Sequence, residues 1–431
     1  MSTGFNRDRD DVARGGKAIV VLPDQGDAHR DADARVEETA GLALAIGLSV
    51  VERIVYRVRA PKPATLIGSG QVEQLAAQVT MEAADLVVFD ASLSPVQQRN
   101  LETALGTKVI DRTGLILEIF GERAATAEGR LQVELAHLDY QAGRLVRSWT
   151  HLERQRGGFG FLGGPGETQI EADRRLIRDR MARLRKELDQ VSRTRGLHRD
   201  RRQRAPWPVI ALVGYTNAGK STLFNRLTGA DVMAENLLFA TLDPTLRQIS
   251  LPGIDKAILS DTVGFVSDLP TQLVAAFKAT LEEVVSADLL IHVRDIAHPD
   301  TDAQRSDVET VLADIGVTDA TPRFEAWNKL DLLDAEDHEA VLAEAERRDD
   351  VVALSALSGE GVFDLINQVA AKLTAAHRRY SITLDAGDGA GVAWLHAHGE
   401  VIESHVEDMT MHVDVRLAPD DHDRFVARDE R

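Results

Sequence analysis

The sequence feature that most constrains the fold is an apolar run that leads directly into a glycine-rich octapeptide. Residues 208–213 read PVIALV, and the octapeptide GYTNAGKS follows from Gly214 to Ser221. A short apolar run that ends at glycine is typical of a buried strand, and a helix is expected from Lys220 onward. The pattern therefore predicts a strand–loop–helix unit in a doubly wound α/β sheet.

The side chains of this loop are those that hold a triphosphate with Mg²⁺. Gly214 and Gly219 allow the backbone to wrap phosphate oxygens with its N–H groups pointing inward. Lys220 neutralises β- and γ-phosphate oxygens, and Ser221 supplies a hydroxyl to Mg²⁺. The helix that follows directs its positive end at the same phosphates. The predicted phosphate-binding residues are Gly214, Tyr215, Thr216, Asn217, Ala218, Gly219, Lys220, Ser221 and Thr222.

Two further segments are expected near the last phosphate. KAILS predicts a strand that ends in DTVG, so Asp261 can hold Mg²⁺ through water and the Gly264 amide can meet the γ-phosphate. FATLDPT contains Thr241, the expected second Mg²⁺ ligand, with Thr245 as the alternative. The predicted contacts are Phe239, Ala240, Thr241, Leu242, Asp243, Asp261, Thr262, Val263 and Gly264. Lys220, Thr241 and Gly264 are the candidate catalytic residues.

Two later motifs, NKLD and SAL, point to guanine as the base. Asp331 can accept hydrogen bonds from the ring N1–H and the exocyclic amine of guanine. Adenine lacks this pair of donors, so it would leave the carboxylate unpaired. Asn328 is expected to brace the loop, and the Lys329 stem to pack over the base. The predicted base-binding residues are Asn328, Lys329, Asp331, Ser355, Ala356 and Leu357, with the Ala356 amide directed at guanine O6.

Phe265 follows DTVG at a position where many GTPases carry a glutamine that orients the attacking water. A phenyl ring cannot orient water by hydrogen bonding, and phosphoryl transfer depends on positioning and charge stabilisation. We therefore expect slow hydrolysis until a partner completes the site. Packing of Phe265 beneath the segment around Gly264, the expected second switch of the GTPase, is the alternative interpretation, and it is compatible with the same slow rate.

Composition and patterning define the wider organisation. The chain has 431 residues, a formal net charge of −19 and no cysteine. The acidic balance argues against general nucleic-acid affinity, and the lack of cysteine excludes disulfides and thiolate zinc sites. No stretch approaches the roughly 20 apolar residues of a membrane span. The expected parts are a disordered N-terminus (1–16), an N-terminal α/β domain (17–128), a basic helical hairpin with a glycine-rich tip (129–204), a nucleotide-binding domain (205–377) and a small C-terminal α+β domain (378–431).

The expected hairpin differs in charge from the rest of the chain. Residues 144–204 contain about 17 basic and about 8 acidic residues. Ile177, Met181, Leu184, Leu188 and Val191 recur at four and three residues, which predicts a two-helix seam. Thr168, near the end of the tract GGFGFLGGPGETQ (157–169), and Glu171 are expected to form the capping box that starts the second helix. A local basic excess beside a glycine loop favours RNA, although a solvated helix face with ion pairs would look similar.

The motifs resemble those of HflX-type GTPases, a translation-factor-related branch with a hydrophobic residue in place of the glutamine. The resemblance rests on TLIGSGQVEQL (65–75), GGFGFLGGPGETQIEADRR (157–175), GYTNAGKSTLFNRLT (214–228) and the stretch from LFATLDPTLR to DTVGFVSDLP (238–270). It implies a GTPase that binds the large ribosomal subunit, splits stalled or idle ribosomes, often under stress, and inserts its glycine tip near the peptidyl-transferase region. The candidate rRNA contacts are Arg154, Arg156, Phe159, Phe161, Arg174, Arg175 and Arg178.

The resemblance also leaves a second function class open. The family has been credited with ATP use through its N-terminal region, and IGSG (67–70) is either a tight turn or a phosphate contact. The alternative is therefore an ATP-driven, helicase-like RNA-remodelling enzyme with a second nucleotide site. On the main interpretation the chain is a cytoplasmic monomer, ribosome-associated or loosely membrane-associated, without DNA or integral membrane contact. Its cofactor is Mg²⁺ with GTP or GDP.

Overall fold

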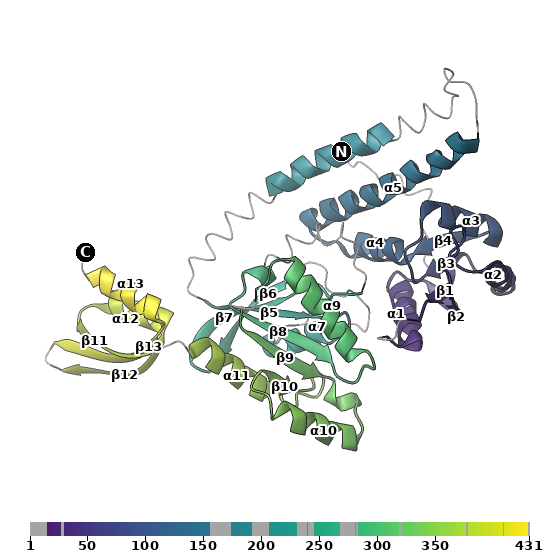
Figure 1. Ribbon diagram of the computed structural model, residues 1–431. Helices are drawn as coiled ribbons and strands as arrows, with labels where there is room; N and C mark the ends of the chain where they lie inside the picture. Colours follow the sequence, from purple (N-terminus) through teal and green to yellow (C-terminus); the bar gives the residue numbers. More distant parts are fainter. Residues whose placement is uncertain are drawn as a thin grey trace.

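Three β-sheets organise the chain, each with its own helices (Figure 1). The computed structural model describes residues 15–26, 30–155, 174–191, 207–230, 239, 245–267, 281, 283–318, 321–375, 378–407 and 409–429. Within this part of the chain, no helix combines the length and the apolar character needed to cross a membrane.

The N-terminal domain is a parallel four-stranded sheet in the order β2-β1-β3-β4. Its strands are β1 (Lys17–Asp24), β2 (Ser49–Arg57), β3 (Leu86–Phe89) and β4 (Lys108–Asp111), and its helices are α1 (Ala32–Ala45), α2 (Ser69–Glu82), α3 (Pro95–Leu105) and α4 (Arg112–Arg123). Alternate residues of the buried strands pack on opposite faces, with α1 and α4 on one face and α2 and α3 on the other. At the start of α3, the Ser94 hydroxyl accepts the Gln97 N–H and Pro95 is the first helical residue, as capping rules favour.

The hairpin pairs α5 (Ala127–Gln155) with a helix over residues 174–191 (Figure 1). Arg180 donates through Nε to Glu134 Oε1 of α5 at 2.7 Å, and Met181 and Leu184 are buried at the expected seam. This side-by-side packing confirms the predicted two-helix seam. The glycine tract and the capping box of Thr168 and Glu171 lie outside the described residues.

The third part of the chain confirms the predicted doubly wound sheet, in the order β10-β9-β8-β5-β7-β6. Its elements are β5 (Val209–Gly214), α7 (Lys220–Thr228), β6 (Thr245–Leu251), β7 (Ile254–Asp261), β8 (Leu289–Asp295), α9 (Thr301–Asp314), β9 (Arg323–Asn328), the 3-10 turn η1 (Leu330–Leu332), α10 (Ala335–Ala345), β10 (Val351–Ala353) and α11 (Val362–Thr374). Only β6 is antiparallel, through its pairing with β7. Loops after parallel strands meet at the carboxyl edge of the sheet, where ligands of such folds bind.

The C-terminal unit is a small α+β domain, as expected. It has a three-stranded antiparallel sheet, β11-β13-β12, with two helices. The elements are β11 (Arg378–Asp385), α12 (Gly389–His398), β12 (Glu400–Glu407), β13 (Thr410–Leu417) and α13 (Pro419–Asp429). Leu395 and Phe425 from the two helices pack on Val413 and Val415 in a separate core.

The first and third parts share one apolar cluster. It joins Leu115 and Phe120 of α4 to Phe265 and to Val308 and Leu312 of α9. The α1/α4 face of the N-terminal sheet is therefore packed against the nucleotide-binding fold rather than against solvent. This shared core places α4 beside the loops at the carboxyl edge of the central sheet.

Buried His292 on β8 predicts how stability depends on pH. Burial lowers the pKa of His292 to about 3, helped by Arg294 and opposed by Glu325. In the unfolded chain this histidine has its ordinary pKa of about 6.5. Between pH 3 and pH 6.5 the unfolded chain therefore binds more protons at His292 than the folded chain does. The free energy of unfolding should therefore fall as the pH falls from about 6.5 toward 3, by at most roughly 1.4 kcal/mol per pH unit. Urea unfolding at pH 7 and pH 5 measures this, and His292→Leu should reduce the difference. An equal difference in that variant would exclude His292 as its source.

Candidate functional site

The loop between β5 and α7 requires glycine at two positions. Gly214 has φ +152° and Gly219 has φ +97°, both in the left-handed region that disfavours side chains. A Cβ at Gly214 would collide with the Val293 carbonyl, and one at Gly219 with the Asn328 side-chain amide. The loop is therefore held close to the backbone of β8 and to the side chain of Asn328 at the end of β9. Of its other residues, Asn217 is exposed with φ +59°, while Tyr215, Thr216 and Ala218 are buried.

The Lys220 side chain folds back onto the start of this loop. Its Nζ donates to the carbonyls of Gly214 at 3.0 Å and Tyr215 at 2.7 Å. Burial lowers the pKa of Lys220 to about 8, and the Asp261 carboxylate opposes this shift. Burial disfavours the charged ammonium, so an anion placed beside it would stabilise that charge. The position suits a phosphate group at the N-terminus of α7.

Ser221 and Asp261 form an oxygen donor pair suited to Mg²⁺. The Ser221 hydroxyl donates to Asp261 Oδ2 at 2.7 Å, and Asp261 is fully buried at the end of β7. Hydroxyl and carboxylate oxygens are the hard ligands that Mg²⁺ prefers, usually with several waters retained. Thr241 lies outside the described residues, as do Ala240, Leu242 and Asp243. Thr245 is the first residue of β6 and pairs in register with Asp261, so the choice between the two threonines stays open.

The segment after Asp261 is hydrogen-bonded to the phosphate-binding loop. The Thr216 N–H donates to the Phe265 carbonyl at 2.7 Å, and the Phe265 N–H donates to the Gly214 carbonyl at 3.1 Å. A Cβ at Gly264 would lie 2.9 Å from Thr216 Cα and 3.1 Å from Lys220 Nζ. The backbone at Gly264 therefore lies so close to the phosphate-binding loop that a side chain there would collide with Thr216. Nearby, Val263 is buried and the Thr262 hydroxyl donates to the Leu212 carbonyl at 2.6 Å.

The Phe265 ring is buried and only 1% exposed. It belongs to the apolar cluster shared with the N-terminal domain. This placement agrees with the packing interpretation of Phe265. A ring in this position offers no hydrogen bond to water, so it leaves the expectation of slow hydrolysis intact.

Asn328 braces the base-binding side of the site. Its Nδ2 donates to the Ala218 carbonyl at 2.7 Å, and its Oδ1 accepts the Ala356 N–H at 2.8 Å. One buried side chain thus ties the phosphate loop to the SAL segment. The Ser355 hydroxyl donates to Asp331 Oδ1 at 2.5 Å, which orients that carboxylate. The Ala356 amide, expected at guanine O6, is used by Asn328 in this arrangement.

Other predicted residues have contacts that the motifs did not indicate. Lys329 has φ +72° and its Nζ lies 2.6 Å from Asp295 Oδ2 at the end of β8. Leu357 is 70% exposed. The Phe239 ring is buried against Phe120 of α4, at 4.7 Å between ring centroids. Thr222 lies half-buried in the first turn of α7.

The candidate RNA contacts are only partly described. Arg156, Phe159 and Phe161 lie outside the described residues, and so does the side chain of Arg154. On the helix over 174–191, Arg175 and Arg178 are exposed and Arg174 is half-buried. In the N-terminal domain, the Gly68 N–H donates to Gln71 Oε1 at the start of α2, so the IGSG segment is a helix-capping turn.

The motifs missed several polar residues that support the site. Arg226 donates through Nε to the Ala356 carbonyl at 2.6 Å. Arg112, Asp90 and Glu38 form a buried cluster on the N-terminal domain, next to Tyr215 of the phosphate loop. A positional signal exists for two of them: Asp90 and Arg112 directly follow buried strands β3 and β4, where functional side chains of parallel sheets gather.

Comparison with known proteins adds family information to this geometry. Four family models match in order: "GTP-binding GTPase N-terminal" over residues 33–121, "GTP-binding GTPase Middle Region" over 123–202, "50S ribosome-binding GTPase" over 209–329 and "HflX C-terminal domain" over 340–428. Together these models account for the N-terminal sheet, the hairpin, the nucleotide site and the C-terminal unit.

Curated relatives match over most of their length. "GTPase HflX" of Magnetococcus marinus is 49% identical over 405 residues, which are 94% of this chain and 93% of the relative. "GTPase HflX" of Escherichia coli is 45% identical over 355 residues, 82% of each chain. A crystal structure of a GTP-binding protein from Sulfolobus solfataricus in complex with GDP is 24% identical, with a TM-score of 0.45, covering 82% of this chain and 97% of that one.

Loss of the Asn328 brace should weaken nucleotide binding. Asn328→Ala removes both hydrogen bonds and leaves a buried carbonyl and a buried N–H without partners. We expect the affinity for fluorescent GDP to fall by about tenfold or more, since about 1.4 kcal/mol corresponds to tenfold. The matched control is Asn100→Ala on α3, which removes the hydrogen bond that the Asn100 side-chain amide donates to the Ala64 carbonyl. Equal affinities for both variants would contradict the brace.

The base preference should follow Asp331. Asp331→Asn replaces one acceptor oxygen by a donor, which suits xanthine rather than guanine. Competition binding with GDP and xanthosine diphosphate should show loss of GDP affinity and gain of xanthosine diphosphate affinity. Asp364→Asn, at an exposed carboxylate on α11, is the control. A variant that keeps its preference for GDP would contradict this assignment.

Proposed function

Because the chain belongs to the HflX family of GTPases, we propose that it binds the large ribosomal subunit and splits stalled or idle ribosomes in a GTP-dependent manner. GTP hydrolysis itself follows from the family and from the matched GTPase domain. The observation that carries the ribosomal part is the match of residues 209–329 to the "50S ribosome-binding GTPase" model. The basic hairpin beside this domain supports the same partner.

Each side chain of the site has a proposed role in the reaction. Ser221 and Asp261 would hold Mg²⁺, which adds positive charge against the phosphate oxygens when it is bound. Lys220 binds the β- and γ-phosphates, and the Gly264 amide donates to the γ-phosphate. Asp331 selects guanine while Asn328 keeps the base loop and the phosphate loop in register. These roles use positioning and charge, the two requirements of phosphoryl transfer.

The buried Phe265 ring leaves no side chain at that position to orient water. We infer slow intrinsic turnover that rises when a ribosomal surface completes the site. The γ-phosphate would then order the segments around Thr241 and Gly264, and its loss would release them. Hydrolysis in this scheme resets a conformational switch.

The hairpin is the proposed RNA-contacting element. A narrow two-helix arm can reach rRNA that a bulky domain cannot. Exposed Arg175 and Arg178 on its second helix are available for phosphate contacts. The glycine-rich stretch between the two helices, with Phe159 and Phe161, is proposed to approach the peptidyl-transferase region.

Turnover with and without large ribosomal subunits tests this function. We expect purified 50S subunits to raise GTP turnover at least tenfold and to co-sediment with the protein in a non-hydrolysable GTP analogue. Deletion of residues 157–166 should preserve GTP binding and remove the stimulation. Splitting is read from the conversion of 70S ribosomes into subunits on sucrose gradients. No stimulation of the intact chain, or full stimulation of the deletion variant, would overturn the respective part of the proposal.

A further inference from the structure

The interface between the N-terminal domain and the nucleotide site contains a buried guanidinium with every donor in use. Arg112, the first residue of α4, donates through Nε to the Ser267 carbonyl at 3.3 Å and through Nη2 to the Ser267 hydroxyl at 2.7 Å. Its other donors bind Asp90 Oδ1 at 2.5 Å, Thr39 Oγ1 at 3.2 Å and Glu38 Oε1. Five N–H groups therefore meet five acceptors, which fixes the plane of the guanidinium.

The same cluster continues into the phosphate loop through Tyr215. The Tyr215 hydroxyl donates to Glu38 Oε2 at 2.9 Å and accepts the Ser267 N–H at 2.9 Å. Burial raises the pKa of Tyr215, so the hydroxyl keeps the proton that it donates. Ser267 is thus bound at its N–H by the loop and at its carbonyl and hydroxyl by α4. It lies three residues after Gly264, whose amide is proposed to meet the γ-phosphate.

The other end of α4 contacts Phe239, the first residue of the FATLDPT segment. The Phe120 and Phe239 rings meet edge to face, with 4.7 Å between centroids and 65° between planes. Both rings are buried in the shared apolar cluster. One helix of the N-terminal domain therefore contacts the segments on both sides of the expected γ-phosphate position.

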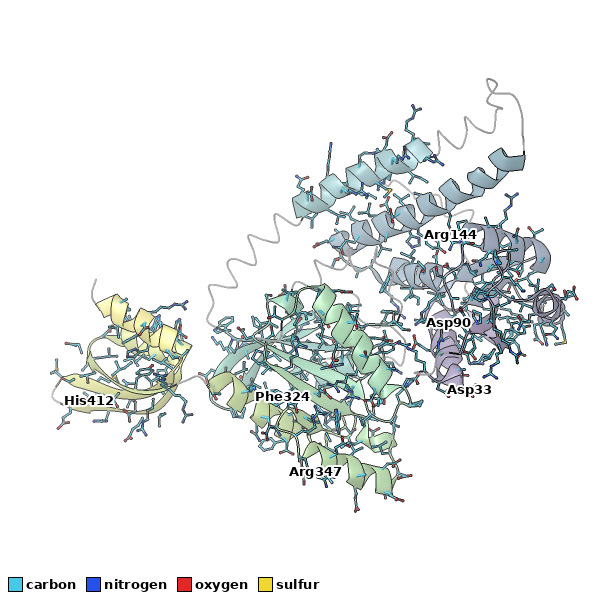
Figure 2. The ribbon with its side chains drawn as sticks, in the orientation of Figure 1. Asp33, Asp90, Arg144, Phe324, Arg347 and His412 are labelled. Carbon is cyan, nitrogen blue, oxygen red and sulfur yellow. The ribbon has the colours of Figure 1, made fainter. Side chains whose placement is uncertain are left out.

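The N-terminus of α4 also contacts α5, the first helix of the hairpin. Asp111 caps α4, and its Oδ1 accepts the Gly114 N–H at 2.8 Å and the Tyr140 hydroxyl at 2.6 Å. Its Oδ2 accepts Arg144 Nη2 of α5 at 2.8 Å. Figure 2 labels Arg144 on the hairpin helix and Asp90 on the N-terminal domain below it. Gly114 leaves the space for this approach, because a Cβ there would lie 2.8 Å from the Tyr140 hydroxyl.

We propose that Arg112 and Tyr215 are positioning residues of the GTPase reaction, which hold the segment after Gly264 against the phosphate loop, and that α4 links this hold to the hairpin through Asp111. Asp111 and Arg112 are adjacent in sequence. Asp111 accepts a hydrogen bond from Tyr140 of α5, and Arg112 donates one to Ser267. A shift of α5 at Tyr140 is thereby transmitted to the N-terminus of α4 and to Ser267. The link to the hairpin rests on the proposed ribosomal function; the hold on Ser267 does not.

The hold should affect the chemical step more than nucleotide binding. Ser267 is hydrogen-bonded to Arg112 and to the Tyr215 hydroxyl, whereas the SAL segment is joined to the phosphate loop independently, by Asn328. Release of Ser267 would leave Gly264 less fixed at the γ-phosphate, which is where charge develops in the transition state. A contact that acts only there lowers kcat without raising KM.

Tyr215→Phe is the sharpest test, since it removes one hydroxyl and keeps the ring. For the full chain without ribosomes, we expect kcat for GTP to fall about threefold to tenfold, with KM and GDP affinity within twofold. Ser267→Ala removes one acceptor of Arg112 and should change kcat in the same direction. Asp300→Ala is the control. It removes a hydrogen bond across the same interface, in which the Asp300 carboxylate accepts the Asp31 N–H, and it leaves the partners of Ser267 in place, so kcat should not change. Unchanged or raised kcat in Tyr215→Phe, or a fall in kcat matched by Asp300→Ala, would overturn the hold on Ser267.

Tyr140→Phe tests the link to the hairpin separately. It removes the hydroxyl that Asp111 accepts and leaves the Arg112 contacts in place. Basal kcat should stay within twofold, while the stimulation of turnover by large subunits should fall at least threefold at equal co-sedimentation. Full stimulation of this variant would overturn the link. Absence of any stimulation in the unaltered chain would overturn the proposed function instead, while the basal measurements on Tyr215→Phe would still decide the hold.

Discussion

The buried Arg112 guanidinium is the interaction on which the arrangement of the two larger domains depends. Burial alone would lower the pKa of Arg112, but the Glu38 and Asp90 carboxylates outweigh that effect and raise it well above its ordinary value. Removing one partner of such a buried ion pair typically costs about 3–5 kcal/mol, because the remaining charge is left uncompensated. The carboxylates of Glu38 on α1 and of Asp90 directly after β3 therefore require this arginine, and the arginine in turn holds Ser267 of the nucleotide-binding fold.

A second constraint acts inside the nucleotide-binding fold, where separate loops meet at backbone distance. Gly219 leaves room for the Asn328 amide, and Gly264 leaves room for Thr216. Asn328 then bonds both the phosphate loop and the SAL segment. Because each loop follows a different strand of one sheet, the spacing of parallel strands sets the geometry of the whole site. A side chain at either glycine would separate loops that must share one ligand.

Sequence reasoning was most successful where the chemistry is local. The strands, the seam of the hairpin at Met181 and Leu184, and the cap of α3 at Ser94 follow from periodicity and capping rules, and the structure has them. Phe265 illustrates the limit. Its inability to orient water follows from its chemistry alone, whereas its burial beneath α4 depends on an apolar cluster assembled from two domains. Phe239 likewise was expected near the nucleotide from its motif, whereas the packing of its ring on Phe120 of another domain could be seen only in the structure.

The sequence by itself determined the GTPase motifs, their order, the carboxylate proposed to select guanine and the basic hairpin, since each depends on residues close together in the chain. Only the tertiary structure decided how the N-terminal domain meets the site. Glu38, Asp90, Arg112, Tyr215 and Ser267 come from five separate segments. Tyr215 lies in the phosphate-binding motif, and Asp90 and Arg112 follow buried strands. No spacing along the chain joins the five residues to one another, because a buried polar cluster is defined by satisfied hydrogen bonds in space. The residues for the chemistry of this protein are thus set along the chain, whereas the contacts between the N-terminal domain, the hairpin and the nucleotide site are set by the tertiary structure.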